Sequence, residues 1–171
     1  LNIKIMRKKI LLLLFSILSF GTNSFAQYHK DILGENFVQQ TIQMPDDYEG
    51  KVIITIIRKE AAHPTTKAIL YVHGFNDYFF QKSLAEHFND AGFNFYAVDL
   101  RKYGRSMLSN QYPFQVHNLN EYFADIDTTL QIIKQEGNHE ILLMGHSTGG
   151  LITSLFCCLL YTSEAGSKKK Y

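Results

Sequence analysis

The feature that most constrains the fold is the segment 145–149, which reads Gly-His-Ser-Thr-Gly between a short apolar run and a helical pattern. A G-x-S-x-G motif between a strand and a helix predicts a sharp turn that strains the backbone at its serine, here Ser147. Gly145, His146 and Gly149 form the rest of the turn, and its small residues let the chain pass tightly. We therefore expect the Ser147 hydroxyl at the C-terminal edge of a sheet, beside a helix N-terminus. The alternative is a glycine-rich turn that matches by chance.

Strand and helix patterns alternate around this motif. Continuous apolar runs, typical of strands buried on both faces, occupy residues 68–72, 93–98 and 141–144. Helical patterns occupy residues 81–91, a segment from Asn118 to Gly137, and residues 151–156. Glu121 stands three residues after Asn118 and would complete a capping box there. Gly92 and Gly137 are placed to end the first two helices. The alternation predicts parallel strands joined by right-handed helical crossovers.

Two further strands precede this unit. Residues 37–44 and the β-branched run 52–57 are separated by a turn-forming group at 45–50. An antiparallel pair is the simplest arrangement for them. The predicted fold class is therefore α/β, a mostly parallel sheet with antiparallel N-terminal strands, in one domain.

Three segments together resemble a known superfamily. They are Leu-Tyr-Val-His-Gly at 70–74, Asp-Leu-Arg-Lys-Tyr-Gly-Arg-Ser at 99–106, and Gly-His-Ser-Thr-Gly-Gly at 145–150. In order and spacing they resemble the α/β-hydrolases, and especially the branch of the serine aminopeptidase S33 domain, monoacylglycerol lipase and lysophospholipase-like enzymes. The resemblance covers about residues 35–156. The second motif more commonly reads D-x-R-G-x-G-x-S, so Lys102 is a departure. These motifs are specific for the fold and much less so for the substrate.

The resemblance implies roles for the residues after the first buried strand. In hydrolases of this fold, one oxyanion-hole donor comes from that loop and the other from the residue after the nucleophile. This assigns Ser147 as the nucleophile and the backbone N–H groups of Phe75 and Thr148 as donors. His73 and Gly74 form the oxyanion loop, and we interpret His73 as orienting that loop rather than as a base.

The catalytic triad of this fold is incomplete in the chain. The triad runs nucleophile, acid, histidine along the sequence, yet no histidine follows Ser147 and the acid that follows it, Glu164, is too near in sequence. A serine without a base is a poor nucleophile. We therefore interpret residues 27–157 as the N-terminal half of a hydrolase domain, truncated after the serine turn and inactive alone.

The last residues support that interpretation. Residues 158–163 resemble a translated transposase end sequence from a sequencing library, and a run of three lysines follows at 168–170. The segment 158–171 is therefore predicted to be a non-native tail; the alternative is a natural, shortened relative. Cys157 and Cys158 are adjacent, which disfavours a disulfide between them.

The N-terminus has the pattern of a secretory signal peptide. Basic residues follow Met6, an apolar run extends to Phe20, and small residues precede Ala26. Residues 6–26 are the predicted signal peptide, cleaved near Ala26, and residues 1–5 lie upstream of the expected start. A membrane anchor is the alternative, but the apolar run is short for a stable span. We expect export to the periplasm or the medium.

Composition excludes some classes of function. The formal net charge of +1 gives no reason to expect nucleic acid as a partner. No phosphate-binding loop or metal-type spacing is present, so no cofactor and no metal are expected. The leading function is hydrolysis of a small acyl-ester or lipid by a carboxylic-ester hydrolase, of the esterase, lipase or lysophospholipase type. Peptidases and perhydrolases use the same residues. The alternative from another class is a non-catalytic binding relative or a half-domain.

Overall fold

The computed structural model describes residues 27–34 and 36–167, with side chains to Leu159. The predicted signal peptide and residues 1–5 lie outside these residues. The elements in chain order are β1 His29–Lys30, β2 Val38–Asp47, β3 Gly50–Lys59, β4 Lys67–Val72, α2 Lys82–Asp90, β5 Asn94–Asp99, the 3₁₀ turn η1 Gly104–Ser106, α3 Glu121–Gln135, β6 Glu140–Gly145 and α4 Thr148–Ser167.

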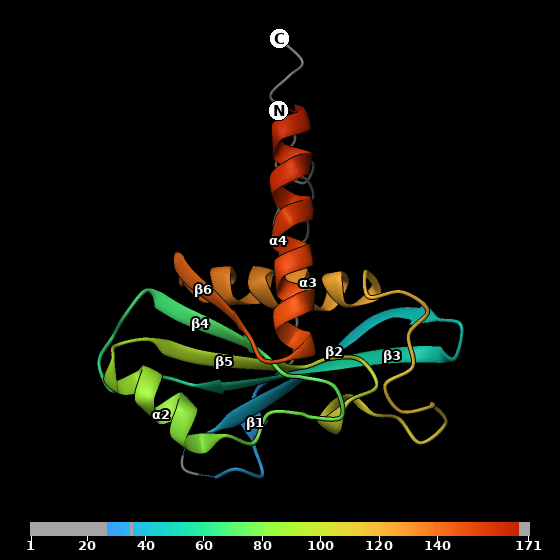
Figure 1. The fold of residues 1–171 in the computed structure, drawn as a ribbon. Coiled ribbons are helices and arrows are strands. Elements are labelled where there is room, and N and C mark those ends of the chain that lie inside the picture. Colours follow the sequence, from blue (N-terminus) through green and yellow to red (C-terminus); the bar gives the residue numbers. More distant parts are fainter. Residues whose placement is uncertain (1–26, 35, 168–171) are drawn as a thin grey trace, which may run out of the picture.

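The strands form one mixed sheet in the order β1-β2-β3-β5-β4-β6. The first three strands pair antiparallel, and β3 also runs antiparallel to β5. β4 lies between β5 and β6 and is parallel to both. The predicted α/β class with antiparallel N-terminal strands is confirmed, and the described sheet is mixed, because its parallel pairing is that of β4 with β5 and β6. Figure 1 shows α2 on one face of this sheet and α3 and α4 on the other.

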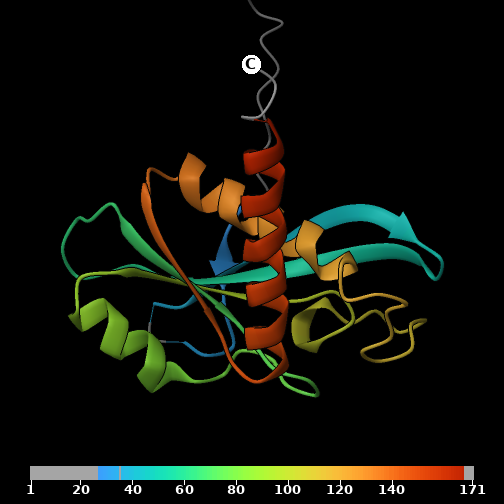
Figure 2. The ribbon, with the colours of Figure 1, turned by 45° about the horizontal axis from the view of Figure 1, so that its top comes forward.

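The alternating strand residues build two apolar layers. In β4, Leu70 and Val72 join the layer under α3 and α4, while Ile69 and Tyr71 join the layer under α2. This is the period of two that a strand imposes on its side chains. Because both layers are filled, β4 is buried along its length after Lys67. Figure 2 shows the sheet and its helices from a tilted direction.

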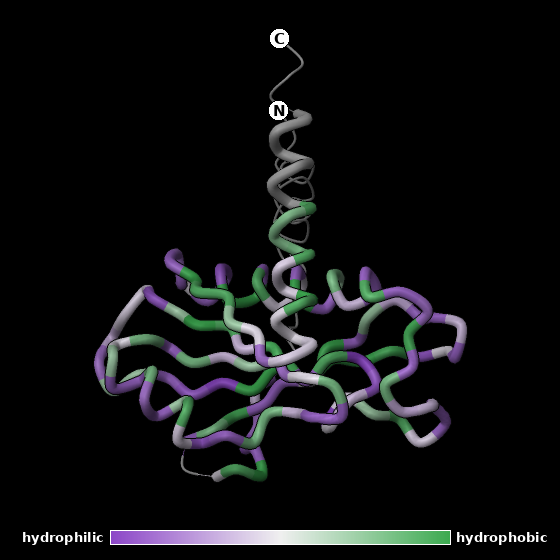
Figure 3. Tube along the Cα trace, in the orientation of Figure 1, coloured by the Kyte–Doolittle hydropathy of each residue, from purple (hydrophilic) through white to green (hydrophobic). Residues whose placement is uncertain are grey.

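The strand that precedes the serine turn lies at an edge of the described sheet. The apolar run at 141–144 is typical of a buried strand, but an edge position is expected for it in a domain truncated after the serine turn. β6 is the edge strand of the described sheet, and Leu142 is 50% exposed. Leu151, Leu155 and Leu159 of α4 are also exposed. Figure 3 shows hydrophobic residues along the described part of α4. Exposed apolar side chains therefore lie on β6 and on α4.

Three element boundaries also differ from expectation. α3 begins at Glu121 rather than just after Asn118, because Asn118 Oδ1 accepts the N–H of Asn120 instead of capping α3. Only the returning half of the capping box forms, with Glu121 accepting the Asn118 N–H at 3.1 Å. β2 continues through Pro45, which was placed in a turn, by way of a register shift between Met44 and Asp47. α4 begins at Thr148 rather than Leu151.

Candidate active site

Ser147 lies in the turn that joins β6 to α4. Its φ is +52°, in the left-handed region that non-glycine residues rarely adopt, and its side chain is exposed. The turn closes with two short hydrogen bonds, from the Gly149 N–H to the His146 carbonyl at 2.8 Å and from the Gly150 N–H to the Ser147 carbonyl at 2.9 Å. The predicted strained serine at the C-terminal edge of the sheet is therefore present.

The two glycines of the turn are required by packing. A Cβ on Gly149 would overlap the backbone carbonyl groups of Val72 and His73, and a Cβ on Gly145 would overlap the backbone of Gly149. The His146 N–H also donates to the Val72 carbonyl at 3.0 Å. The end of β4 and the serine turn are thus in direct backbone contact, and a larger residue at either glycine would separate them.

The loop after β4 lies against Ser147. A Cβ built on Gly74 would stand 3.1 Å from the Cβ of Ser147. Phe75 follows, and its side chain is 63% exposed. Among the described residues, the backbone N–H groups of Phe75 and Thr148 donate to no protein acceptor. Thr148 is the first residue of α4, where the helix dipole favours negative charge.

His73 is a buried connector within this loop. Its Nε2 accepts the Leu100 N–H at 3.1 Å, so Nδ1 carries the proton and donates to the Gly74 carbonyl at 2.8 Å. Burial lowers the pKa of the imidazole, which is therefore neutral. Since both ring nitrogens are engaged, the geometry agrees with an orienting residue and leaves neither nitrogen free for Ser147.

Asp99 and Arg105 brace the loop that follows β5. Asp99 accepts the Phe79 N–H at 2.9 Å and the Arg105 guanidinium at 2.9 Å. Arg105 also pairs with Asp31 at 2.7 Å, a contact across 74 residues that the sequence pattern did not reveal. Arg101 and the fully buried Asp125 form a second such pair at 2.7 Å.

Lys102 is the most unusual residue of this loop. It stands where the resembling motif carries glycine, and its φ is +63°, which explains why glycine is common there. Its side chain is fully buried, with Nζ 2.8 Å from Asp47, in contact with Glu49 and 4.3 Å from the centre of the Tyr48 ring. Lys102 therefore connects the β2–β3 turn to the loop that follows β5. The lysine that replaces the motif glycine thus has a structural role of its own.

The remaining candidates have no partner in a catalytic arrangement. Five scattered histidines are exposed, as expected: His29, His63, His87, His117 and His139. Cys157 and Cys158 are free and exposed. In the described part of the chain, no histidine is hydrogen-bonded to the Ser147 hydroxyl, and no cluster of three or more His, Cys, Asp or Glu is placed to hold a metal. No helix there has the length and apolarity needed to cross a bilayer.

Two hollows lie on different parts of the molecule. The larger, about 510 Å³, is lined by Tyr28, Arg58, Glu136 and neighbours, and includes no predicted site residue. A smaller one, about 320 Å³, is lined by Asn76, Asp77, Tyr78 and residues of the loop after β5. Only the smaller one adjoins the loop that carries Phe75.

The sheet, its helices and the serine turn define an α/β-hydrolase fold. The chain belongs to the family described as serine aminopeptidase, S33, whose model matches residues 63–166. A comparison with curated protein sequences gave no match.

Solved structures share this fold at low sequence identity. A carboxyl esterase from Bacillus coagulans is 21% identical, with a TM-score of 0.56, over 67% of this chain and 38% of that one. A probable hydrolytic enzyme from Pseudomonas aeruginosa is 19% identical, with a TM-score of 0.58, over 73% and 38%. An epoxide hydrolase from Vigna radiata is 18% identical, with a TM-score of 0.53, over 75% and 37%. The matched region thus spans less than two-fifths of each of these structures.

Proposed function

We propose that Ser147 is the nucleophile of a serine hydrolase that cleaves carboxylic esters through an acyl-enzyme. The observation that carries the proposal is the exposed Ser147 at positive φ, packed against the loop of Gly74. Left-handed backbone at a non-glycine residue costs about 1–2 kcal/mol. The fold maintains this conformation through the close contacts of Gly145 and Gly149, which is what presentation of a nucleophile requires.

The mechanism follows from the groups around Ser147. Its hydroxyl oxygen attacks the ester carbonyl, and the hydroxyl proton passes to a histidine base. The negative charge on the carbonyl oxygen is stabilised by the N–H groups of Phe75 and Thr148. The proton then goes to the leaving alcohol, and water releases the acid in a second, equivalent attack.

The base and its acid are the parts that this chain does not supply. His73 has both ring nitrogens engaged, and the other described histidines make no hydrogen bond to Ser147. We propose that both groups lie in the sequence that follows residues 27–157 in the complete protein. This agrees with the small share of each related structure that the chain spans.

A serine hydrolase is favoured over those chemistries of this fold that use a carboxylate nucleophile. Epoxide hydrolases and dehalogenases attack with a carboxylate, whereas the turn here presents a hydroxyl. The carboxyl esterase relative and the lysophospholipase-like resemblance both favour a small acyl-ester or lipid substrate.

A non-catalytic binding role is the second candidate. The observation in its favour is the lack of a base hydrogen-bonded to Ser147 in the described part of the chain. Such a protein would keep the glycines for packing alone.

Ester hydrolysis by the chain extended along its source DNA tests the proposal. With p-nitrophenyl acetate as substrate, Ser147→Ala should abolish turnover, with a loss of at least about 10³-fold. Ser154→Ala is the matched control, since Ser154 is an exposed serine of α4 whose hydroxyl bonds the Gly150 carbonyl. Equal turnover by wild type and Ser147→Ala would reject Ser147 as the nucleophile and favour the binding role.

A further inference from the structure

Residues with strained backbone gather beside the candidate site. Among the described residues, positive φ at a non-glycine position occurs at Asn36, Asn76, Lys102, Phe114 and Ser147. Three of these five, Asn76, Lys102 and Phe114, line the same hollow of about 320 Å³. Such conformations cost about 1–3 kcal/mol each and persist where the surrounding structure imposes them, most often at ligand sites. This clustering indicates a shaped site rather than an incidental surface depression.

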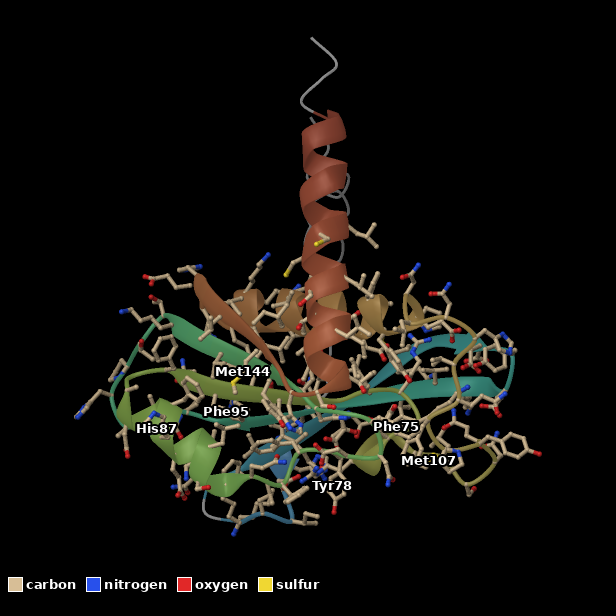
Figure 4. The ribbon with its side chains drawn as sticks, viewed as in Figure 1. Phe75, Tyr78, His87, Phe95, Met107 and Met144 are labelled. Carbon is tan, nitrogen blue, oxygen red and sulfur yellow. The ribbon has the colours of Figure 1, made fainter. Side chains whose placement is uncertain are left out.

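The hollow begins one residue from a proposed oxyanion donor. Asn76, on its lining, directly follows Phe75, and the Phe75 ring packs edge-on against Phe114 with centroids 5.3 Å apart. Gly74, on the other side of Phe75, approaches Ser147. Figure 4 shows Phe75, Tyr78 and Met107 on the same side of the sheet, near the start of α4. A group held in the hollow is therefore close to an ester carbonyl at Ser147.

The walls of the hollow are held in place. The Phe114 N–H donates to the Lys102 carbonyl at 3.1 Å, which links two of the strained residues. The Lys102 side chain is anchored by Asp47 and Glu49. On the opposite wall, a Cβ on Gly104 would stand 2.5 Å from the Cβ of Tyr78, so the glycine allows the two segments to meet.

The lining fixes the chemistry of the occupant. Tyr78, Met107, Pro113 and Phe114 offer aromatic and apolar surface, and Met sulfur also contacts aromatic rings favourably. Two charged residues line the hollow: the Lys102 ammonium is buried in its ion pairs, and Asp77 has its Oδ2 3.9 Å from Nδ1 of His146. A carboxylate there disfavours an anion. The volume lies at the lower end of the ~300–1,000 Å³ range of small-molecule pockets, so the occupant is compact.

We propose that this hollow binds a compact, uncharged aromatic group of the ester substrate, of the size of a phenyl ring. The inference rests on the proposed function for its link to Ser147. A flat ring can stack on the aromatic faces of Tyr78 and Phe114, a contact that a long unbranched acyl chain does not make.

Saturation-transfer NMR with the 171-residue chain tests the inference. Methyl benzoate should receive saturation from the protein, while methyl octanoate should receive much less. Ligand-observed signals remain readable if the protein self-associates. Two variants fill the hollow: Met107→Trp on its wall, and Pro113→Trp at an exposed lining position. Each should weaken methyl benzoate binding by at least about tenfold. Tyr112→Trp is the matched control, because Tyr112 belongs to the same loop but is 71% exposed and lies outside the lining.

The outcomes separate this inference from the proposed function. If circular dichroism shows that one filling variant has lost its fold, methyl benzoate binding by the other variant decides the test. Methyl benzoate binding that Ser147→Ala retains and the filling variants lose supports the hollow even where Ser147 proves unreactive. No binding by wild type, equal binding by both filling variants, or preference for methyl octanoate overturns the inference, whatever the reactivity of Ser147.

Discussion

The backbone N–H of His146 donates a 3.0 Å hydrogen bond to the carbonyl of Val72. The residue before the candidate nucleophile is therefore fixed to the last residue of β4, from which the oxyanion loop departs. Because β4 and β6 are parallel neighbours, their C-terminal ends meet at one edge of the sheet. The relative position of Ser147 and the Gly74 loop is a property of the sheet itself.

Gly149→Ala tests how tightly these two ends pack. Its Cβ would overlap the carbonyl groups of Val72 and His73, so the free energy of unfolding should fall by about 1–3 kcal/mol. Gly150→Ala is the control, since its nearest contact would be an ordinary 3.4 Å from the Gly145 carbonyl and alanine favours a helix. Urea unfolding measures both. If Gly149→Ala left the free energy of unfolding unchanged, the contact would not be a tight one.

Lys102→Met tests the buried ammonium. It leaves Asp47 and Glu49 without the cation that they share, so the free energy of unfolding should fall by more than in a variant that loses an exposed ion pair. Lys59→Met is the matched control, because Lys59 pairs with the half-exposed Glu86 and such pairs contribute about 0–1 kcal/mol. Similar urea midpoints for the two variants would mean that Lys102 contributes little to stability.

The ion pairs of Lys102 with Asp47 and Glu49 also predict that the stability of the protein depends on pH. Burial acts to raise the pKa of Asp47, but the hydrogen bond and charge of Lys102 and the hydrogen bond from the Glu49 N–H together outweigh it and lower that pKa. The hydrogen bond from the same lysine lowers the pKa of Glu49. The folded state therefore binds fewer protons than the unfolded state, so this stabilisation is present above the ordinary carboxylate pKa of about 4 and is lost as pH falls through the lowered values.

Urea unfolding of wild type and Lys102→Met at pH 7 and pH 3 measures this effect. The difference in stability between the two proteins should shrink at pH 3. A difference that stays constant or grows would contradict the role given to the two carboxylates.

Exposed apolar side chains on β6 and α4 predict self-association. Residues 27–171 expressed alone should aggregate, because β6 is an edge strand with Leu142 half exposed and because α4 exposes Leu151 and Leu155. Leu142→Lys should reduce the association, since a charge at a sheet edge opposes edge pairing. Sedimentation velocity over a concentration series measures it. A monomeric wild type with one cooperative thermal transition would refute this prediction.

The predicted signal peptide is tested at the N-terminus. In a Gram-negative host, the exported protein should begin at Gln27, one residue after Ala26. Mass spectrometry of the periplasmic fraction measures this. Detection of a protein that still carries residues 6–26 would contradict cleavage.

Local patterns were sufficient for the elements and the serine turn. Each of these features depends on a few neighbouring residues, and a single period or steric rule determines it. They are the strand runs at 68–72 and 93–98, the glycines at 92 and 137, and the GHSTG segment. The apolar run at 141–144 indicates only a strand, whereas the outer position of β6 depends on which strands flank it.

Long-range ion pairs were beyond the sequence patterns. Arg105 meets Asp31 across 74 residues, and Lys102 meets Asp47 only because the β2–β3 turn folds against the loop after β5. A partial signal did exist for Lys102, since a non-glycine residue at a motif glycine implies either strain or a compensating contact. The hollow beside Phe75 depends on these same contacts, because its lining combines residues 76–78 with residues 102–114.

The reactivity of Ser147 is the most direct test of the central claim. A fluorophosphonate probe forms a covalent bond with an activated serine, and the protein to label is the chain extended along its source DNA, beside Ser147→Ala and Ser154→Ala. The account predicts labelling of wild type and Ser154→Ala, none of Ser147→Ala, and a histidine and an acid in the added sequence. An unlabelled wild type, or labelling that survives Ser147→Ala, would contradict it.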